Sequence, residues 1–147
     1  VTALDTTAAA LGVAQANAHQ WGLDVHFLES DWWSAVAQQR FHLALSNPPY
    51  IAQLDPHLHA LAHEPLLALA SGPDGLASIR TIVAGAAPHL HPGGWLLLEH
   101  GHDQAEEVRA LLSAAGFSNV QSRNDLSGVS RCSGGQRGPI PSCTEGH

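Results

Sequence analysis

The sequence has no methionine, only two cysteines, and no apolar run long enough to cross a bilayer. Cys132 and Cys143 lie near the C-terminal end without Cys-x-x-Cys spacing, so neither a disulfide framework nor a cysteine zinc site is indicated. No charged and then apolar leader opens the chain. We therefore expect a soluble, cytoplasmic protein with no membrane partner, and the missing methionine leads us to expect an N-terminal truncation.

Positive charge is also scarce. Six Lys and Arg residues face 13 Asp and Glu residues, which gives a formal net charge of −7. A protein that follows nucleic-acid phosphates over a broad surface needs the opposite balance. The composition therefore favours a protein or small-molecule substrate, and no direct nucleic-acid binding is expected.

Histidine is abundant, with 11 residues, but the histidines are spread over separate segments. None stands beside a thiolate or in a His-Glu-x-x-His helix, which are the patterns that predict a zinc site. We expect no metal.

Strand-like segments alternate with helical segments along the chain. Apolar periodicity and turn residues predict strands at 1–5, 25–31, 40–47, 95–101 and 117–123, and helices at 8–20, 74–90 and 103–116. Residues 55–75 are expected to be irregular, with a helical turn near 66–70. This alternation predicts one α/β domain with a parallel, doubly wound sheet.

Polar side chains end four of the predicted strands, at Asp5, Asp31, Asn47 and Glu99. In open parallel sheets the ligand crevice lies outside the carboxyl ends of the strands. Together these residues predict a site for a polar small molecule, although each alone is also common as a cap or turn residue.

The Asn-Pro-Pro-Tyr stretch that follows the third strand predicts recognition of a planar NH₂ group. Pro48 and Pro49 have no N–H and a fixed φ, so they offer only carbonyl acceptors on a rigid backbone. The Asn47 side-chain oxygen and the Pro48 carbonyl can each accept one hydrogen of the NH₂ group, while Tyr50 lies against its flat face.

An amide nitrogen is a poor nucleophile because its lone pair is delocalised. Orienting both hydrogens aims the nitrogen and favours charge build-up as a bond forms, and losing one such partner typically costs about 10²- to 10³-fold in rate. The chain shows no other nucleophile paired with a base, so the substrate is inferred to supply the nucleophile.

Several segments carry a specific resemblance from Val1 to about Arg131. Besides "SNPPY" they are "ESDWWSAV", "NPPYIAQLDPHL", "HEPLLAL", "GPDGLASIR", "GGWLLLEHG" and "RNDLSGVSR". As a set they resemble the S-adenosylmethionine-dependent glutamine methyltransferases of peptide-chain release factors, the PrmC/HemK family.

The resemblance implies a seven-stranded, mostly parallel, Rossmann-like methyltransferase sheet. It implies methyl transfer from S-adenosylmethionine to the amide nitrogen of the glutamine in a release factor Gly-Gly-Gln loop. Asn47, Pro48, Pro49 and Tyr50 match the substrate-binding stretch, within which Asn47, Pro48 and Tyr50 are the expected catalytic residues.

The same resemblance assigns the cofactor-binding residues. Asp5 matches the acid that binds the ribose hydroxyls, Asp31 and Trp32 match a pair beside the adenine, and Asn47 also contacts the cofactor. Trp33 follows directly, and the sequence leaves open which tryptophan faces the crevice, with Trp32 favoured by the family match.

The sequence departs from the family pattern at both ends. The family's first strand, its glycine-rich turn and the N-terminal helical domain are absent, so residues 1–131 are expected to be a partial domain. Residues 132–147, rich in Gly, Pro and Ser, are expected to be a disordered tail. Gly134-Gly135-Gln136 in this tail repeats the methylated tripeptide, which we interpret as coincidence rather than self-methylation.

Two alternatives to the release-factor reading remain. One keeps the chemistry but changes the acceptor to a nucleic-acid base amine or a ribosomal-protein glutamine. The other is an inactive, non-catalytic fragment of such an enzyme, which the missing glycine-rich turn supports.

Overall fold

The computed structural model describes residues 1–52 and 71–139. The chain divides into two compact units, Val1–Gln39 and Arg40–His147, and each is described by itself. The helical turn predicted near residues 66–70 lies outside the described residues.

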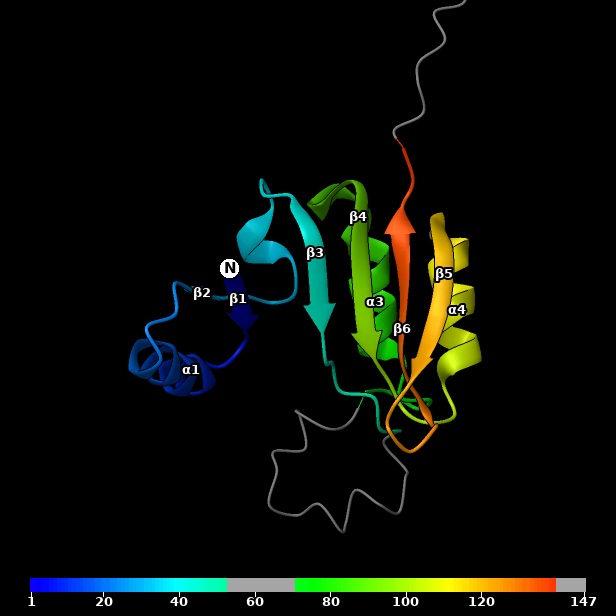
Figure 1. The fold of residues 1–147 in the computed structure, drawn as a ribbon, viewed down its shortest axis with the longest axis horizontal. Helices are drawn as coiled ribbons and strands as arrows, with labels where there is room; N and C mark the ends of the chain where they lie inside the picture. The colour runs from blue at the N-terminus through cyan, green and yellow to red at the C-terminus, as the bar shows by residue number, and fades with distance from the viewer. Residues whose placement is uncertain (53–70, 140–147) are drawn as a thin grey trace, which may run out of the picture. The chain divides into compact units, whose positions relative to one another are not determined.

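The first unit contains a parallel pair of strands with one helix between them. Its elements are β1 (Thr2–Asp5), α1 (Ala8–Gln20), β2 (His26–Glu29) and the short 3₁₀ helix η1 (Ser34–Val36) (Figure 1). Thr2 pairs with His26 and Asp5 with Glu29, so both strands end at the same edge. The predicted bounds of α1 are confirmed, and Gly22, with φ +62°, turns the chain after it.

The described residues of the second unit form a four-stranded sheet and two α-helices. Its elements are β3 (Phe41–Ser46), α3 (Ala77–Ala86), η3 (Ala87–His89), β4 (Leu90–Glu99), α4 (Ala105–Ala114), β5 (Phe117–Asn124) and β6 (Ser130–Arg137). The strand order is β3-β4-β6-β5, with β3 and β4 parallel and β6 antiparallel to both of its neighbours.

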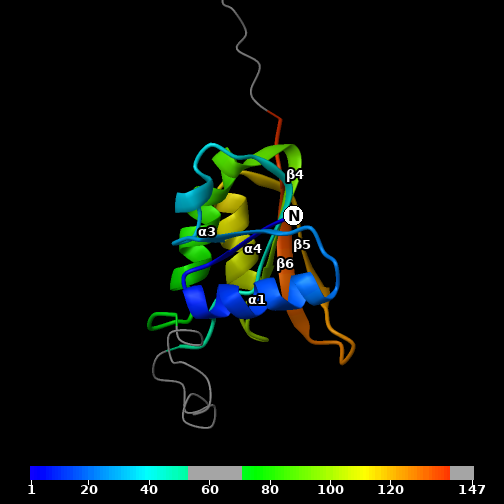
Figure 2. The same ribbon diagram turned by 90° about the vertical axis from the view of Figure 1, so that its left-hand side faces the viewer.

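Helices α3 and α4 cover one face of this sheet (Figure 2). Leu96 and Leu98 of β4 point to that face and are fully buried, because side chains alternate along a strand. The buried residues of the two helices recur at helical spacing. The buried residues of α3 and α4 are Ile79, Ile82, Val83, Ala86, Val108 and Leu112.

Leucines of β3 and β4 occupy the opposite face of the same sheet. Leu45 pairs in register with Leu97, and Leu43 and Leu45 are 51% and 70% exposed. Among the described residues β3 pairs only with β4, so it is the edge strand of this four-stranded sheet.

Strand β4 begins earlier than the sequence pattern predicts. The Pro-Gly-Gly stretch that was expected to separate helix from strand lies inside β4 as an irregularity, since Phe41 pairs with Leu90 but Leu43 pairs with Trp95. Gly93 has φ +80°, and a Cβ at Gly94 would lie 2.9 Å from the His91 carbonyl oxygen. These glycines therefore permit a bulge instead of ending the strand.

The predicted disordered tail is wrong for residues 132–137, which lie in β6 between β4 and β5. The glycines there serve close packing rather than flexibility. A Cβ on Gly134 would be 2.6 Å from the Leu96 carbonyl oxygen, and one on Gly135 would be 2.8 Å from Phe117 Cβ. The remainder of the tail, residues 140–147, lies outside the described residues.

The side chain of Gln136 forms hydrogen bonds with neighbouring segments of the sheet. Its Oε1 accepts a hydrogen bond from Asn119 Nδ2 at 2.8 Å, and its Nε2 donates to the Gly93 carbonyl at 2.8 Å. The Gly-Gly-Gln tripeptide thus has a structural explanation that involves no methylation.

Candidate active site

The first unit places Asp5 and Asp31 at the carboxyl ends of β1 and β2. The Ser30 N–H donates to the Asp5 carbonyl at 2.9 Å, which joins the two strand ends. The Asp5 carboxylate accepts from the Thr7 N–H at 2.8 Å and is exposed. The two acids predicted from sequence therefore share one edge.

Trp32 has a backbone conformation that is rare for a large side chain. Its φ of 50° lies in the left-handed region, which costs an L-residue roughly 1–2 kcal/mol. Ser30 Oγ holds this turn, because it donates to the Trp32 carbonyl at 2.8 Å and accepts from the Ala35 N–H at 3.1 Å. Both Trp32 and Trp33 are partly exposed, so the choice between them stays open.

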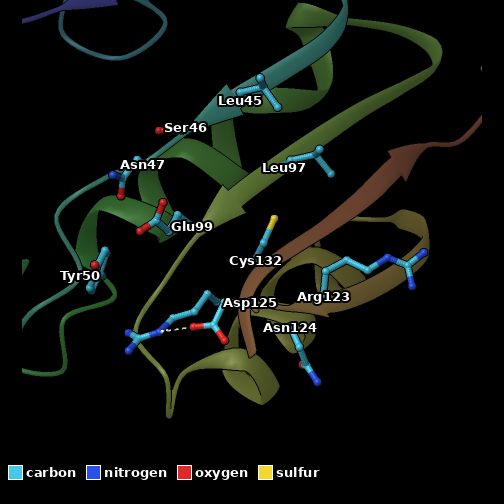
Figure 3. A pocket seen from close by; sticks show the side chains of 11 residues that line it. Leu45, Ser46, Asn47, Tyr50, Leu97, Glu99, Arg123, Asn124, Asp125 and Cys132 are labelled. Atoms are coloured by element: carbon cyan, nitrogen blue, oxygen red, sulfur yellow. Dashed lines mark ion pairs between the residues drawn. The ribbon is translucent and has the colours of Figure 1, made fainter. Parts of the chain in front are cut away.

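The second unit has a pocket of about 770 Å³ at the carboxyl ends of β3 and β4 (Figure 3). Asn47, Tyr50 and Glu99 gather at one end of it, and Arg123 and Asn124 lie at the other. The full lining comprises Leu45, Ser46, Asn47, Tyr50, Leu97, Glu99, Arg123, Asn124, Asp125, Arg131 and Cys132.

The two predicted acceptors have no competing donor among the described residues. Asn47 is exposed, and its side-chain amide makes no hydrogen bond with another residue of that set. The Pro48 ring is buried, and no N–H of the described residues donates to its carbonyl. Within this part of the chain, both oxygens are consequently available to an incoming NH₂ group.

Sequence reasoning missed several residues that line this pocket. Glu99 was noted as a strand-ending acid but received no role, and its register partner Cys132 comes from the segment predicted to be disordered. Arg131 Nε lies 3.8 Å from Asp125 Oδ2, the ion pair drawn in Figure 3. The sequence signal for Glu99 was its position at the end of a predicted strand, and Arg131 stood in a segment that carries the family resemblance, whereas Cys132 gave no signal.

The Cys132 thiol is not suited to act as a nucleophile. Burial and the nearby Glu99 carboxylate both raise its pKa, since each disfavours the thiolate. This agrees with a reaction in which the substrate supplies the nucleophile.

Metal-ligating side chains do not cluster within residues 1–52 and 71–139. No three His, Cys, Asp or Glu side chains there come together as a metal site. No helix in this part of the chain has the length and apolar character needed to cross a membrane.

The predicted site residues thus form two groups. Asp5, Asp31 and Trp32 lie together in the first unit, and the stretch from Asn47 to Tyr50 lies in the second. Each group sits where parallel strands end, as the sheet topology predicts.

Comparison with known proteins shows similarity to methyltransferases. The model of the methyltransferase small domain family matches residues 1–72. Over 145 residues the chain is 53% identical to a release factor glutamine methyltransferase from Burkholderia pseudomallei, with 92% of this chain and 51% of that protein covered. The chain spans about half the length of the curated relatives it matches.

Solved structures agree on the fold. A methyltransferase from Pyrococcus furiosus matches with a TM-score of 0.71 at 19% identity, covering 95% of this chain and 63% of that one. A release factor-specific protein-(glutamine-N5) methyltransferase from Alicyclobacillus acidocaldarius matches with a TM-score of 0.51 at 27% identity, covering 94% and 79%. The chain has the Rossmann-like methyltransferase fold, which confirms the predicted fold class.

Proposed function

We propose that this chain, which is homologous over 92% of its length to release factor glutamine methyltransferases, forms the greater part of the catalytic domain of such an enzyme. The reaction is methyl transfer from S-adenosylmethionine to the side-chain amide nitrogen of a release factor glutamine. The observation that carries the proposal is the Asn-Pro-Pro-Tyr stretch at the end of β3, with both acceptors unengaged by the described residues beside an open pocket.

Asn47 and Pro48 bind and aim the substrate amide in this proposal. The Asn47 Oδ1 and the Pro48 carbonyl each accept one amide hydrogen, and the Tyr50 ring packs against the amide plane. When bound, the cofactor would supply an electrophilic methyl group on a sulfonium sulfur, which would keep the electron pair of the broken carbon–sulfur bond while the methylated nitrogen would lose one proton to water.

The first unit supplies the cofactor-binding residues in the same proposal. Asp5 accepts hydrogen bonds from the ribose hydroxyls, as an acid after a strand does in dinucleotide folds. Asp31 and Trp32 bind beside the adenine, and Asn47 also contacts the cofactor. Support comes from the shared edge of β1 and β2, where Ser30 links the two acidic strand ends.

The partner in this proposal is a peptide-chain release factor, which places the enzyme in the cytoplasm. A net charge of −7 disfavours the alternative in which a nucleic-acid base amine is the acceptor. A ribosomal-protein glutamine would present the same amide, so direct assay of both substrates separates these two.

The test is methylation of a purified release factor, followed by mass spectrometry of its Gly-Gly-Gln peptide. Titration with S-adenosylhomocysteine first shows whether the folded chain binds cofactor, and Asp5→Ala should abolish that binding. Asn47→Ala should lower methylation roughly 10²- to 10³-fold, because one preorganised acceptor is lost. Asn17→Ala, on an exposed part of α1, is the control.

Cofactor binding without methylation of any glutamine substrate would contradict the proposed substrate. No binding by a folded chain would favour the inactive-fragment alternative.

A further inference from the structure

Gln104 is a buried amide directly before α4, and it joins three separate segments. The residue is only 8% exposed. Oε1 accepts from the Gly101 N–H at 2.8 Å, while Nε2 donates to the Tyr50 carbonyl at 3.0 Å and to the Asp74 carbonyl at 3.2 Å. One side chain therefore connects the end of the Asn-Pro-Pro-Tyr stretch to the starts of α3 and α4.

The Gln104 side-chain amide can make these hydrogen bonds in only one orientation. Carbonyl oxygens can only accept and the Gly101 N–H can only donate, so the NH₂ group must face Tyr50 and Asp74. A glutamate has the same shape but, when ionised, no donor. It would place negative oxygens against two carbonyl groups, which makes Gln104→Glu a sharp probe of this contact.

Gly75 packs against the same carbonyl group from the neighbouring turn. It has φ +75°, and a Cβ built there would lie 2.3 Å from the Tyr50 carbonyl oxygen and 2.8 Å from Gln104 Nε2. The next carbonyl along the chain, that of Ile51, accepts from the Ser71 N–H at 2.9 Å. Two successive carbonyls after the prolines are thus held by fixed donors.

The need for such donors follows from the prolines. Pro48 and Pro49 have no N–H, so backbone hydrogen bonds can fix these two residues only through their carbonyl groups. The Pro48 carbonyl is the proposed substrate acceptor and must stay available. Anchoring therefore falls on the residues after the prolines, where Gln104 supplies a donor to Tyr50.

We propose that Gln104 is a positioning residue, which holds Tyr50 and the preceding acceptors in place for glutamine methylation. This inference rests on the function proposed above for its catalytic meaning. Its geometric part, that Gln104 determines the environment of Tyr50, can be tested without any enzymatic activity.

The geometric test uses the fact that Tyr50 is the only tyrosine in the sequence. Biosynthetic labelling with 3-fluorotyrosine therefore gives a single ¹⁹F NMR signal from this chain. We expect Gln104→Glu to shift or split that signal, whereas Gln15→Glu, the same chemical change on an exposed position of α1, leaves it unchanged. Circular dichroism checks that both variants are folded.

A second variant keeps the test decisive if Gln104→Glu does not fold. Gly75→Ala keeps the glutamine at position 104 but places a methyl group against both the Tyr50 carbonyl oxygen and Gln104 Nε2, so it disturbs the same contact and should also move the ¹⁹F signal. A Tyr50 signal that is the same in wild type and in the folded variant would overturn the inference.

The catalytic part is read from kinetics. With methylation of a release factor as the assay, Gln104→Glu should lower kcat roughly 10²-fold, the effect of misplacing a reacting group by about 1 Å. The KM for S-adenosylmethionine should change much less than kcat, because Asp5, Asp31 and Trp32 of the first unit are untouched and only Asn47 is shared between the two sets. An unchanged kcat with a shifted ¹⁹F signal would overturn the catalytic role.

The two proposals fail in distinguishable ways. A wild-type chain that methylates no glutamine contradicts the proposed function, while the ¹⁹F comparison still decides whether Gln104 positions Tyr50.

Discussion

At the scale of single residues, Gly134 shows how a position can require the absence of a side chain. A methyl group there would meet the backbone of β4, 2.6 Å from the Leu96 carbonyl oxygen. Backbone can move less easily than a side-chain tip. Flexibility, the usual meaning of glycine in a Ser- and Pro-rich stretch, is thus not its role here.

We expect Gly134→Ala to lower the free energy of unfolding by about 1–3 kcal/mol, the range for overpacking a tight site. Urea denaturation followed by circular dichroism measures this change. Gly138→Ala is the matched control, because a Cβ there meets nothing within 4 Å. Equal destabilisation by both substitutions would show that the close contact in β6 is not the cause.

A buried hydrogen-bond chain through His100 gives a second prediction at this scale. His100 Nδ1 donates to the Gly101 carbonyl at 2.8 Å, and Nε2 lies 2.7 Å from Ser133 Oγ. Ser133 Oγ lies 2.7 Å from Ser122 Oγ, which in turn accepts from Arg109 at 2.7 Å. His100 is fully buried, so its ring nitrogen cannot find water instead.

Ser133→Ala should therefore cost about 1–3 kcal/mol of unfolding free energy, because it leaves buried polar groups without a partner. The control is Ser113→Ala, at an exposed position in α4. Thermal or urea unfolding of the two variants gives the comparison, and a Ser133→Ala variant as stable as the control would contradict it.

At the scale of elements, the start of α3 is organised by Asp74. Its carboxylate accepts from the Leu76 N–H at 3.0 Å and from two nitrogens of the Arg80 guanidinium. The Arg80 hydrogen bonds, then the Leu76 N–H, lower the pKa of Asp74 from 3.8 to about 2. A carboxyl with a lowered pKa stabilises the fold above its unfolded value and loses that contribution as it becomes protonated.

We expect the stability difference between wild type and Asp74→Asn to be present at neutral pH and to disappear as the pH falls from about 4 to about 2. Melting temperatures measured across this range test it. Arg80→Gln removes the same pair from the other side and should show the same trend. A difference that persists at pH 2 would mean that the ion pair is not responsible.

At the scale of the whole molecule, two units and an incompletely covered sheet edge are the main features. Among the described residues strand β3 pairs only with β4, and Leu43 and Leu45, on the sheet face away from α3 and α4, are 51% and 70% exposed. Unpaired apolar strand edges favour association between chains. The chain spans about half the length of its relatives, and we expect the exposed edge of β3 to promote self-association when this chain is purified alone.

Leu45→Lys should weaken concentration-dependent self-association by roughly tenfold, because about 1.5–3 kcal/mol is typical for burying one leucine. Analytical ultracentrifugation over a concentration series measures the effect. Leu126→Lys is the control, since Leu126 is also an exposed leucine but lies in the turn between β5 and β6. Identical association of both variants would place the contact away from β3.

Local sequence patterns predicted most of the helices and strands, because residue spacing, turn residues and backbone restriction act between neighbours in sequence. Small and apolar residues with high helix propensity and the stop at Gly22 predict α1, although only Leu11 and Ala18 of this helix are buried, and apolar runs predict β3 and β4. The prolines of the Asn-Pro-Pro-Tyr stretch constrain their own backbone. The hydrogen-bonding character of that stretch, with carbonyl acceptors and no N–H donors at the two prolines, follows from its residue types and their order.

Other features were decided only by neighbours in space. Residues 132–137 form a strand because they pair with both β4 and β5, at a position where glycines pack closely. The composition of this segment does not reveal that pairing. Gln104 reaches Tyr50 across 54 positions of sequence, a contact that no local pattern carries. By itself the sequence determined the order of the strands and helices as far as β5, the acids at the strand ends and the rigid, donor-poor backbone of the Asn-Pro-Pro-Tyr stretch, since these depend on local backbone and residue type. The tertiary structure decided which glycines are packed and which side chain holds Tyr50, because close packing and buried hydrogen bonds exist only once distant segments meet.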